Sequence, residues 1–509
     1  MNAGAGDPLR VVMIGSRLPS RSETFVYREL LALRALGVDI RPASVRTPDA
    51  SDLAPEARAL AAEAIPIYGN GRGWWLGVLL ALVWPAAWRV FWRAHRDAWR
   101  RMPRARADAM EAADPPAPAG PLTMRDRVAL FTQAAGAVAL AWRVRGFRPQ
   151  LIHAHLAHVP CTIAMYTAEA LRVPFAFTGH AAGLFRDGRL LDLKAARAAF
   201  VGCISAWHRD WMVRAFGVDT AKLPIIRCGV DVDEAKTRAS GEPASAGGAC
   251  PGSAPPAEAV SPGHAQARPF RIVTVGRLVP KKGLDLLIAA FARCLEHGSL
   301  PAASELVIVG DGPERDRLAA LAAELGIAER LAWRGGLPHA EALGAIRSGD
   351  VFALLARPAA DGDRDGVPVV LMEAMAAGVP VIAGGLPAIR ELVRDGETGF
   401  IVDTGSASTL VGPGGDRGGA GEAEAAIGAT SRLLNRIYRE VCEASPPNSD
   451  TRIPPMATPD NPDAGSPAEP DSLAGVAERA RLWVATEFAT PTNACRWRDA
   501  AAAAIRCGR

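Results

Sequence analysis

Short apolar runs alternate with helix-spaced apolar positions along the first part of the chain. Residues 10–14 form a short apolar run that is typical of a buried strand. Residues 23–36 carry large apolar side chains at helical spacing, and Gly37 after them predicts the end of a helix. The same order recurs as far as residue 234, with the last strand expected at 224–227. This order predicts a parallel sheet covered by helices on both faces.

A second series of the same kind begins near residue 269. Residues 235–268 in between are rich in Ala, Gly, Pro and Ser and lack apolar periodicity, which is typical of a flexible linker. Two more low-complexity stretches, 405–421 and 444–473, interrupt the second series. The predicted units are a first α/β domain at 1–234, the linker at 235–268, a second α/β domain at 269–473 and closing helices at 474–509.

The composition is that of a chain with sizeable cores. The 509 residues are 49% hydrophobic and 22% charged, which excludes a wholly disordered protein and a small disulfide-rich scaffold. The formal net charge is only +4, but residues 1–234 carry 30 basic against 21 acidic side chains. This excess of positive charge in the first half favours an anionic partner there.

The cysteine pattern and the lengths of the apolar runs indicate in which cell compartment the protein works. Eight cysteines are scattered with no C-x-x-C pair, which is typical of a reduced, cytosolic protein. The N-terminal residues lack the basic stretch and apolar core of a secretory signal. The most apolar run, 74–88, contains Pro85 and is shorter than the ~20 residues that a membrane-spanning helix needs. We therefore expect a cytoplasmic protein.

Tryptophan and arginine are concentrated in residues 74–106. This segment holds six of the twelve Trp residues, and Trp84, Trp88 and Trp92 fall on one face of a helix. Seven Arg residues lie at 89–106. Trp interleaved with Arg suits a peripheral contact with an anionic membrane surface. Packing of the Trp face against its own domain is the alternative, and the sequence leaves both open.

A basic turn follows the first strand of the second domain. Gly276 allows close backbone approach, and the helix expected from residue 284 offers its N-terminus to an anion. Only five of the 58 basic residues are Lys, yet Lys281 and Lys282 are adjacent here. We predict that Arg277 and Lys282 hold a diphosphate between them, with a solvated turn as the alternative.

Two carboxylates eight positions apart mark a second candidate site. Asp365 lies in an expected loop, and the backbone of Gly366, Val367 and Pro368 can contact a polar ligand. Glu373 stands in an apolar run on the helix that follows, where a carboxylate usually has a partner. We predict that Glu373 binds the hydroxyls of a ribose. A surface loop followed by an amphipathic helix is the alternative.

Histidines lie around two predicted strand ends of the first domain. His180 follows the strand expected at 174–178 and can reach a cleft between the domains, although a structural role is equally open. His153, His155 and His158 invite a metal interpretation. We take the rings of His153 and His155 to point to opposite faces, and no Cys or carboxylate completes a set nearby. We therefore expect no metal ion.

Eight segments together resemble retaining glycosyltransferases of family four, and among these the exopolysaccharide and colanic-acid-type members. The resemblance covers nearly the whole chain except the linker and the 405–473 insertions. The segments are SETF (22–25), LIHAHLAH (151–158), FAFTGHA (175–181), IIRCGVD (225–231), VGRLVPKKGLD (275–285), IVGDGP (308–313), DGDRDGVPVVLMEAMAAGVPVIA (361–383) and GLPAIRELVRDGETGFIV (385–402). The resemblance implies an α/β protein of the GT-B type, with two Rossmann-like domains that face each other across a cleft.

The resemblance also implies roles for the candidate residues. Arg277 and Lys282 resemble the pair that neutralises the donor diphosphate in place of a metal ion. Glu373 resembles the second Glu of an E-x7-E motif, which holds the ribose. The backbone at Gly276 and at 366–368 would contact the donor.

Two further positions follow from the same motifs. His180 resembles the first-domain His that lies near the sugar and the acceptor. Asp365 stands where the family has the first Glu of E-x7-E, one methylene longer. Asp365 is therefore expected to bind a sugar hydroxyl, or the role falls to Asp363.

The expected function is transfer of a sugar from a nucleotide-diphosphate-sugar to a glycan or lipid-linked acceptor, in cell-surface polysaccharide synthesis. No cofactor and no metal is expected, and the enzyme would work in the cytoplasm, peripheral to the inner face of the cell membrane. A non-catalytic nucleotide-sugar-binding protein is the alternative.

Two other protein classes fit less well. A nicotinamide dehydrogenase is disfavoured because Arg315 replaces the third Gly of the fingerprint at 310–315. Nucleic-acid binding is disfavoured because the positive charge is concentrated in one Trp-rich segment.

Overall fold

The computed structural model describes most of the chain. The described residues are 8–20, 23–48, 53, 55–69, 73–100, 122–185, 189–236, 269–405, 417–444 and 472–507. Most of the expected linker at 235–268 and most of the low-complexity stretches at 405–421 and 444–473 lie outside the described residues, as do residues 101–106 of the Trp-rich segment.

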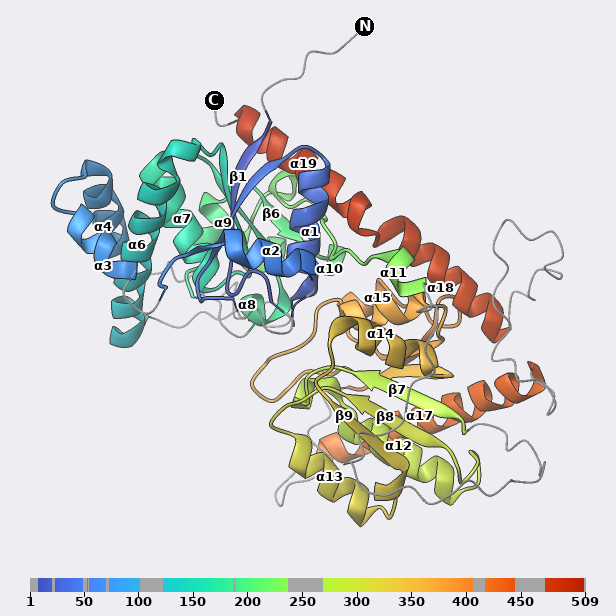
Figure 1. Ribbon diagram of the computed structural model, residues 1–509. Coiled ribbons are helices and arrows are strands. Elements are labelled where there is room, and N and C mark those ends of the chain that lie inside the picture. Colours follow the sequence, from blue (N-terminus) through green and yellow to red (C-terminus); the bar gives the residue numbers. More distant parts are fainter. Residues whose placement is uncertain are drawn as a thin grey trace, which may run out of the picture.

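Six parallel strands form a sheet in the first half, in the order β3-β2-β1-β4-β5-β6 (Figure 1). β1 and β4 pair in the middle, with Val11 opposite Leu151 and Ile14 opposite Ala154. Both strands are buried on both faces, which is why they appear in the sequence as short apolar runs. The strands are β1 (Arg10–Gly15), β2 (Asp39–Ser44), β3 (Ile65–Pro66), β4 (Leu151–His155), β5 (Phe175–Gly179) and β6 (Val201–Cys203).

Helices cover this sheet. The α-helices of the first half are α1 (Thr24–Ala35), α2 (Pro55–Glu63), α3 (Gly73–Leu80), α4 (Pro85–Ala98), α6 (Met124–Val144), α7 (Val159–Leu171), α8 (Ala181–Phe185), α9 (Leu191–Arg197), α10 (Ala206–Phe216) and α11 (Val232–Lys236). The strand expected at 224–227 is wrong. Only Ile225 bridges Cys203 there, because Pro224 has no N–H to donate and the pairing stops after Ile226.

A second sheet of six parallel strands follows, in the order β12-β11-β10-β7-β8-β9. The strands are β7 (Arg271–Val275), β8 (Glu305–Val309), β9 (Leu331–Gly335), β10 (Val351–Leu354), β11 (Val381–Gly384) and β12 (Phe400–Val402). The α-helices are α12 (Leu284–Glu296), α13 (Arg315–Glu324), α14 (His339–Ser348), α15 (Val369–Ala376), α16 (Pro387–Arg390) and α17 (Arg417–Ala444). Two Rossmann-like α/β halves are therefore present, which confirms the expected fold class.

The closing helices connect the two halves. α18 (Leu473–Glu487) packs against α15 in the second half, and α19 (Thr490–Cys507) packs against α1 in the first (red in Figure 1). The halves also meet directly, because the Glu391 carboxylate accepts hydrogen bonds from the backbone N–H groups of Ala206 and Trp207. The carboxyl ends of the strands in both sheets are thus held near one another across this contact.

Candidate functional site

Gly276, Arg277 and Lys282 line one narrow pocket at the carboxyl end of β7, which is too tight in this structure to admit a water molecule. Gly283 leads the chain into α12 with a φ of +61°, and a Cβ there would lie 2.0 Å from the Leu355 carbonyl oxygen. A side chain at that position would be strained. The turn places Lys282 close to Gly276, where an added Cβ would lie 3.4 Å from Lys282 Cε. The three residues expected to contact a diphosphate therefore lie together.

Carboxylates in the loop before α15 face the two lysines. Lys282 Nζ lies 2.7 Å from Asp365 Oδ2, while Lys281 Nζ lies 3.3 Å from Asp365 Oδ1 and 3.1 Å from Asp363 Oδ1. Burial raises the pKa of Asp365, but the two ammonium groups more than offset this, and the pKa lies below its ordinary value. Asp365 is therefore ionised and paired with Lys282.

Glu373 lies on α15 with its side chain only 6% exposed. Burial raises the pKa of Glu373 to about 7, with Arg28 acting to lower it and Glu234 to raise it. His339 Nε2 lies 3.7 Å from Glu373 Oε1. Arg28 belongs to α1 in the first half. The residue expected to hold a ribose therefore has a cation from the opposite half among its neighbours.

The backbone at Gly366, Val367 and Pro368 runs along the contact between the halves. An added Cβ on Gly366 would lie 2.8 Å from Ile204 Cδ1 and 3.1 Å from His208 Cε1, both in the first half. Burial lowers the pKa of His208 to about 3, so its ring is neutral. Val367 is buried, and Pro368 immediately precedes α15.

His180 follows β5 and is 8% exposed. Its Nε2 lies 3.3 Å from His155 Nδ1, its Nδ1 lies 3.8 Å from Cys228 Sγ, and the Phe25 ring packs on it at 4.8 Å. Burial, together with His155 and His208, holds the pKa of His180 well below its ordinary value. His180 is therefore a neutral imidazole whose two nitrogens face protein partners.

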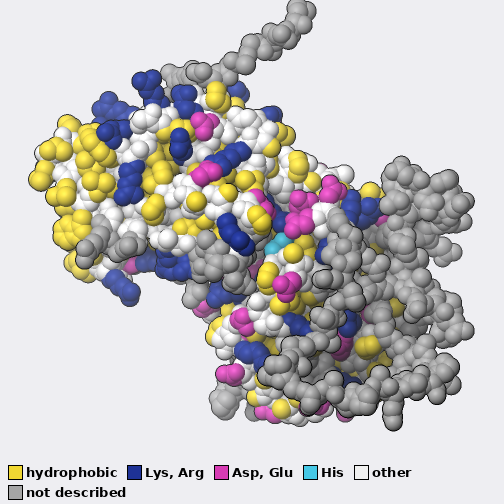
Figure 2. Space-filling model, viewed as in Figure 1, with side chains coloured by type: hydrophobic (Ala, Val, Ile, Leu, Met, Phe, Trp, Pro, Cys, Tyr) yellow, Lys and Arg dark blue, Asp and Glu magenta, His cyan; other side chains and the backbone are white. Residues whose placement is uncertain are grey.

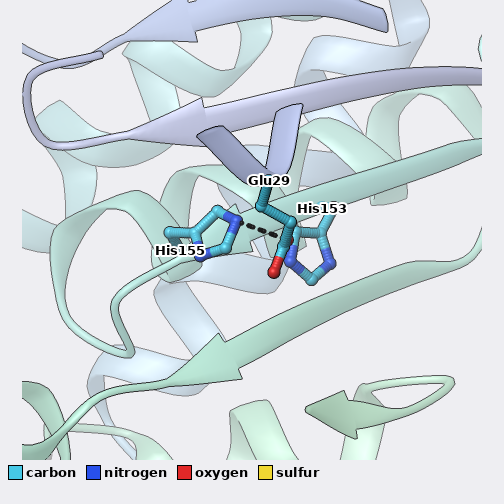
Figure 3. A group of neighbouring side chains, drawn as sticks. All are labelled: Glu29, His153 and His155. Carbon is cyan, nitrogen blue, oxygen red and sulfur yellow. Dashed lines mark ion pairs between the residues drawn. The ribbon is translucent and has the colours of Figure 1, made fainter. Parts of the chain in front are cut away.

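His153 and His155 lie on the same face of β4, and Glu29 from α1 lies against them (Figure 3). The two ring centroids are 5.1 Å apart, and His155 Nε2 lies 3.1 Å from Glu29 Oε1. The prediction of opposite faces is wrong, because side chains at i and i+2 of a strand point to the same face. The expectation that no carboxylate stands nearby is also wrong, since Glu29 comes from a helix far earlier in the sequence.

The partners of His153 do not suit a cation in this cluster. Trp497 Nε1, which can only donate, lies 3.3 Å from His153 Nε2, and the Thr178 hydroxyl lies 3.1 Å from the same nitrogen. Burial holds the pKa of His153 well below its ordinary value, so the neutral ring carries its proton on Nδ1. The nitrogen left for a ligand is thus an N–H group without a lone pair. The cluster is better suited to hold the Glu29 carboxylate than a metal ion.

Two protein-family models match the chain. The model described as "Glycosyltransferase Family 4" matches residues 121–234, which include His180. The model described as "Glycosyl transferases group 1" matches residues 260–412, which include the basic pocket and Glu373. Glycosyltransferase family models thus match a stretch in each half of the chain.

Curated relatives of the chain carry glycosyltransferase names. The "GDP-mannose-dependent alpha-(1-6)-phosphatidylinositol monomannoside mannosyltransferase" of Mycolicibacterium smegmatis is 40% identical over 133 residues, 26% of this chain and 34% of the relative. The "Amylovoran biosynthesis glycosyltransferase AmsK" of Erwinia amylovora is 34% identical over 143 residues, 28% of this chain and 34% of the relative. The chain thus spans about a third of the length of each.

A solved structure shares the architecture of the chain. HepE of Anabaena, crystallised with UDP and glucose, superposes with a TM-score of 0.56 over 97% of this chain and 100% of that chain, at 14% identity. This likeness supports the GT-B arrangement of two Rossmann-like halves.

Sequence reasoning missed several residues that lie beside the candidate residues. Arg28, Glu29, Glu234, His208 and His339 all lie beside the predicted site residues. The signal available in the sequence was weak, because each comes from a different element and only the fold brings them together. Their positions within the first two turns of helices are the one shared feature.

Proposed function

We propose that the chain is a retaining glycosyltransferase that moves a sugar from a nucleoside-diphosphate-sugar to a glycan or lipid-linked acceptor. Synthesis of a cell-surface polysaccharide or glycolipid is the process that the named relatives favour. The observation that carries the proposal is the pocket after β7, where Arg277 and Lys282 stand at the carboxyl ends of the second sheet. That edge is where open α/β sheets bind nucleotides.

The chemistry follows from charge. When the sugar–phosphate bond breaks, negative charge builds on the departing diphosphate, and fixed cations in a dry pocket stabilise that charge most. Arg277 and Lys282 supply these cations without a metal ion. The acceptor hydroxyl then attacks the sugar face that the diphosphate leaves, and a phosphate oxygen takes its proton. No protein nucleophile is required.

The ion pairs around Asp365 are compatible with binding of a diphosphate at Lys282. A diphosphate that binds Lys282 draws the ammonium away from Asp365, while Lys281 still faces that carboxylate at 3.3 Å. Asp365 can then accept a hydrogen bond from a sugar hydroxyl. His180 is neutral and held by His155 and Cys228, so we assign it a positioning role beside the sugar and no proton transfer.

A membrane-bound acceptor is the second part of the proposal. Figure 2 shows hydrophobic side chains gathered at the end of the molecule where Figure 1 places α3 and α4. Trp88 is 65% exposed, Trp92 59%, Leu82 78% and Val83 76%. An exposed apolar patch of this kind on a soluble domain usually marks an interaction site. We infer that it lies in the headgroup region of an anionic bilayer.

The packing of α4 supports a helix that lies on the surface. Its small side chains, among them Ala87, Val90 and Ala94, are buried against the domain, so Trp88 and Trp92 point outward. Trp84 packs against Trp142 at 5.5 Å instead. Of the helices in the described part of the chain, none alone has the length and hydropathy to cross a bilayer. α3 and α4 together have that length and hydropathy, but the pair is bent by 107°.

Replacing Lys282 by Ala tests the catalytic proposal. We expect transfer from the true donor to fall by about 100-fold or more, because one charged group facing the leaving diphosphate is lost. The measurement is the turnover number with the nucleotide sugar that most raises the melting temperature in a thermal-shift panel.

Lys222→Ala is the matched control, because Lys222 is exposed and lies away from the pocket. Near-normal transfer by K282A would contradict the assignment. Tight donor binding by the wild type without any transfer would instead indicate a nucleotide-sugar-binding protein.

A further inference from the structure

Four side chains from four elements meet at Glu373. They are Arg28 of α1, Glu234 of α11, His339 at the start of α14 and Glu373 of α15, and we call them the His339 cluster. Arg28 forms an ion pair with Glu234. α14 follows β9, so His339 stands at the same sheet edge as the pocket after β7.

The Nε2 atom of His339 lacks a hydrogen-bond partner among the described residues. It is buried and makes no hydrogen bond to any residue in the described part of the chain. Glu373 Oε1 and Glu234 Oε1 each lie 3.7 Å away, which is too far for a direct hydrogen bond. An unsatisfied buried polar atom costs free energy unless a ligand or water completes it. Two carboxylate oxygens thus lie near the ring nitrogen without a direct hydrogen bond to it.

The protonation of His339 identifies it as a donor. Burial lowers the pKa of His339 to about 4, and Arg28 and Arg347 act in the same direction. Its ring is therefore neutral at pH 7 and carries one N–H group. Because Nε2 faces two carboxylates, the proton belongs on Nε2 and leaves Nδ1 with the lone pair.

A hydroxyl group fits this arrangement of donor and acceptor. A hydroxyl donates one hydrogen bond and accepts others, while the ionised form of Glu373 can only accept. Glu373 alone can therefore accept the hydrogen bond from the ribose hydroxyl, but it gives the hydroxyl oxygen no donor. On the basis of the proposed function, we propose that His339 is a second ribose ligand, which donates from Nε2 to the hydroxyl that Glu373 accepts from.

Arg28 and Glu234 position His339 for this role. Arg347 Nη1 donates to the backbone carbonyls of Glu234 and Ala235 at 3.1 and 3.4 Å, which holds α11 against α14. Arg28, which belongs to the same half as Glu234, forms an ion pair with the Glu234 side chain. The acid that faces His339 from the other side is thus fixed by a contact between the halves, and ribose binding becomes linked to their approach.

The test compares the affinities for ribonucleotides and deoxyribonucleotides of proteins with and without the His339 imidazole. UDP and GDP, with their 2′-deoxy and 3′-deoxy counterparts, are titrated by calorimetry into the wild type, His339→Phe and His339→Gln. H339F keeps the ring shape without an N–H, and H339Q restores a side-chain N–H. H297A is the control, because His297 is exposed on α12.

We expect the wild type to prefer the ribonucleotide over one deoxy form by about tenfold, the size of one well-made hydrogen bond. H339F should lose most of that preference by weakening ribonucleotide binding alone, and H339Q should recover part of it. Full discrimination by H339F would overturn the proposal and leave the donor assignment intact. If no nucleoside diphosphate binds the wild type, the proposed function fails as well.

Discussion

At the scale of single residues, Glu373 combines a functional position with a cost in stability. Its carboxyl group is almost fully buried, and burial raises its pKa to about 7. A glutamate in the unfolded chain ionises near pH 4.5. Between these values the unfolded chain has lost the proton that the folded chain keeps. The free energy of unfolding therefore falls as the pH rises from about 4.5 to 7.

Glu373→Gln should remove this pH dependence. We expect E373Q and the wild type to be equally stable near pH 4.5, and E373Q to be more stable by up to about 3 kcal/mol at pH 8. Urea unfolding at a series of pH values measures this difference. Glu341→Gln is the control, because the Glu341 side chain is exposed on α14. If the unfolding free energies of E373Q and the wild type change with pH in parallel, the shifted pKa of Glu373 is refuted.

Individual residues could be predicted from the sequence only where a local pattern carried the signal. Arg277, Lys282 and Glu373 were chosen from their immediate neighbours, and the fold places Arg277 and Lys282 in one pocket. The partners of Glu373 could not be chosen this way. Arg28 and Glu234 are separated by most of the first half, and only the fold brings them together beside Glu373.

At the scale of elements, burial decided which predictions succeeded. Strands such as β1 and β7 are buried on both faces, so their short apolar runs stand out between polar loops. No helix was predicted at 124–144. α6 lies there, and its buried face is built mostly of Ala, which gives little hydrophobic contrast. Thr123 and Asp126 do form a capping box at its start, a signal that was present in the sequence.

The exposed face of α4 gives a prediction at this scale. Replacing Trp88 and Trp92 by Ser should abolish most binding to vesicles of phosphatidylglycerol, because two interfacial anchors are lost. The fold should be unaffected, since both side chains are exposed. Co-flotation with vesicles measures binding, with phosphatidylcholine vesicles as the uncharged comparison.

Leu482→Ser is the matched control, because Leu482 is 53% exposed on α18, away from the patch. Unchanged flotation of the W88S/W92S variant would reject the membrane surface. Weaker flotation of L482S to the same degree would show that the assay reports general hydrophobicity.

At the scale of the whole molecule, the two halves are joined by contacts of different kinds. α19 returns from the second half to α1, where Trp497 is fully buried beside His153. Arg347 of the second half donates to the Glu234 backbone carbonyl of the first half, close to the predicted ribose site. The sequence predicted two halves and a cleft, yet it could not predict these joints, because each depends on the relative placement of separately folding units.

Glu391 offers the most direct way to loosen the halves. Its carboxylate lies 2.8 Å from the Ala206 nitrogen and 2.6 Å from the Trp207 nitrogen, at the first turn of α10 in the opposite half. These N–H groups have no partner within their own helix, because the first turn of a helix leaves its donors unsatisfied.

Glu391→Ala should therefore speed hydrogen exchange at residues 206 and 207 by at least about tenfold, as a charge-assisted bond of roughly 1.5–3 kcal/mol is lost. It should also raise the apparent KM for the donor more than it lowers kcat, since closed forms become rarer while the pocket after β7 keeps its residues. Glu397→Ala, on an exposed side chain a short distance along the same segment, should change neither quantity. Unaltered exchange at residues 206 and 207 in E391A would mean that this carboxylate does not hold the halves together in solution.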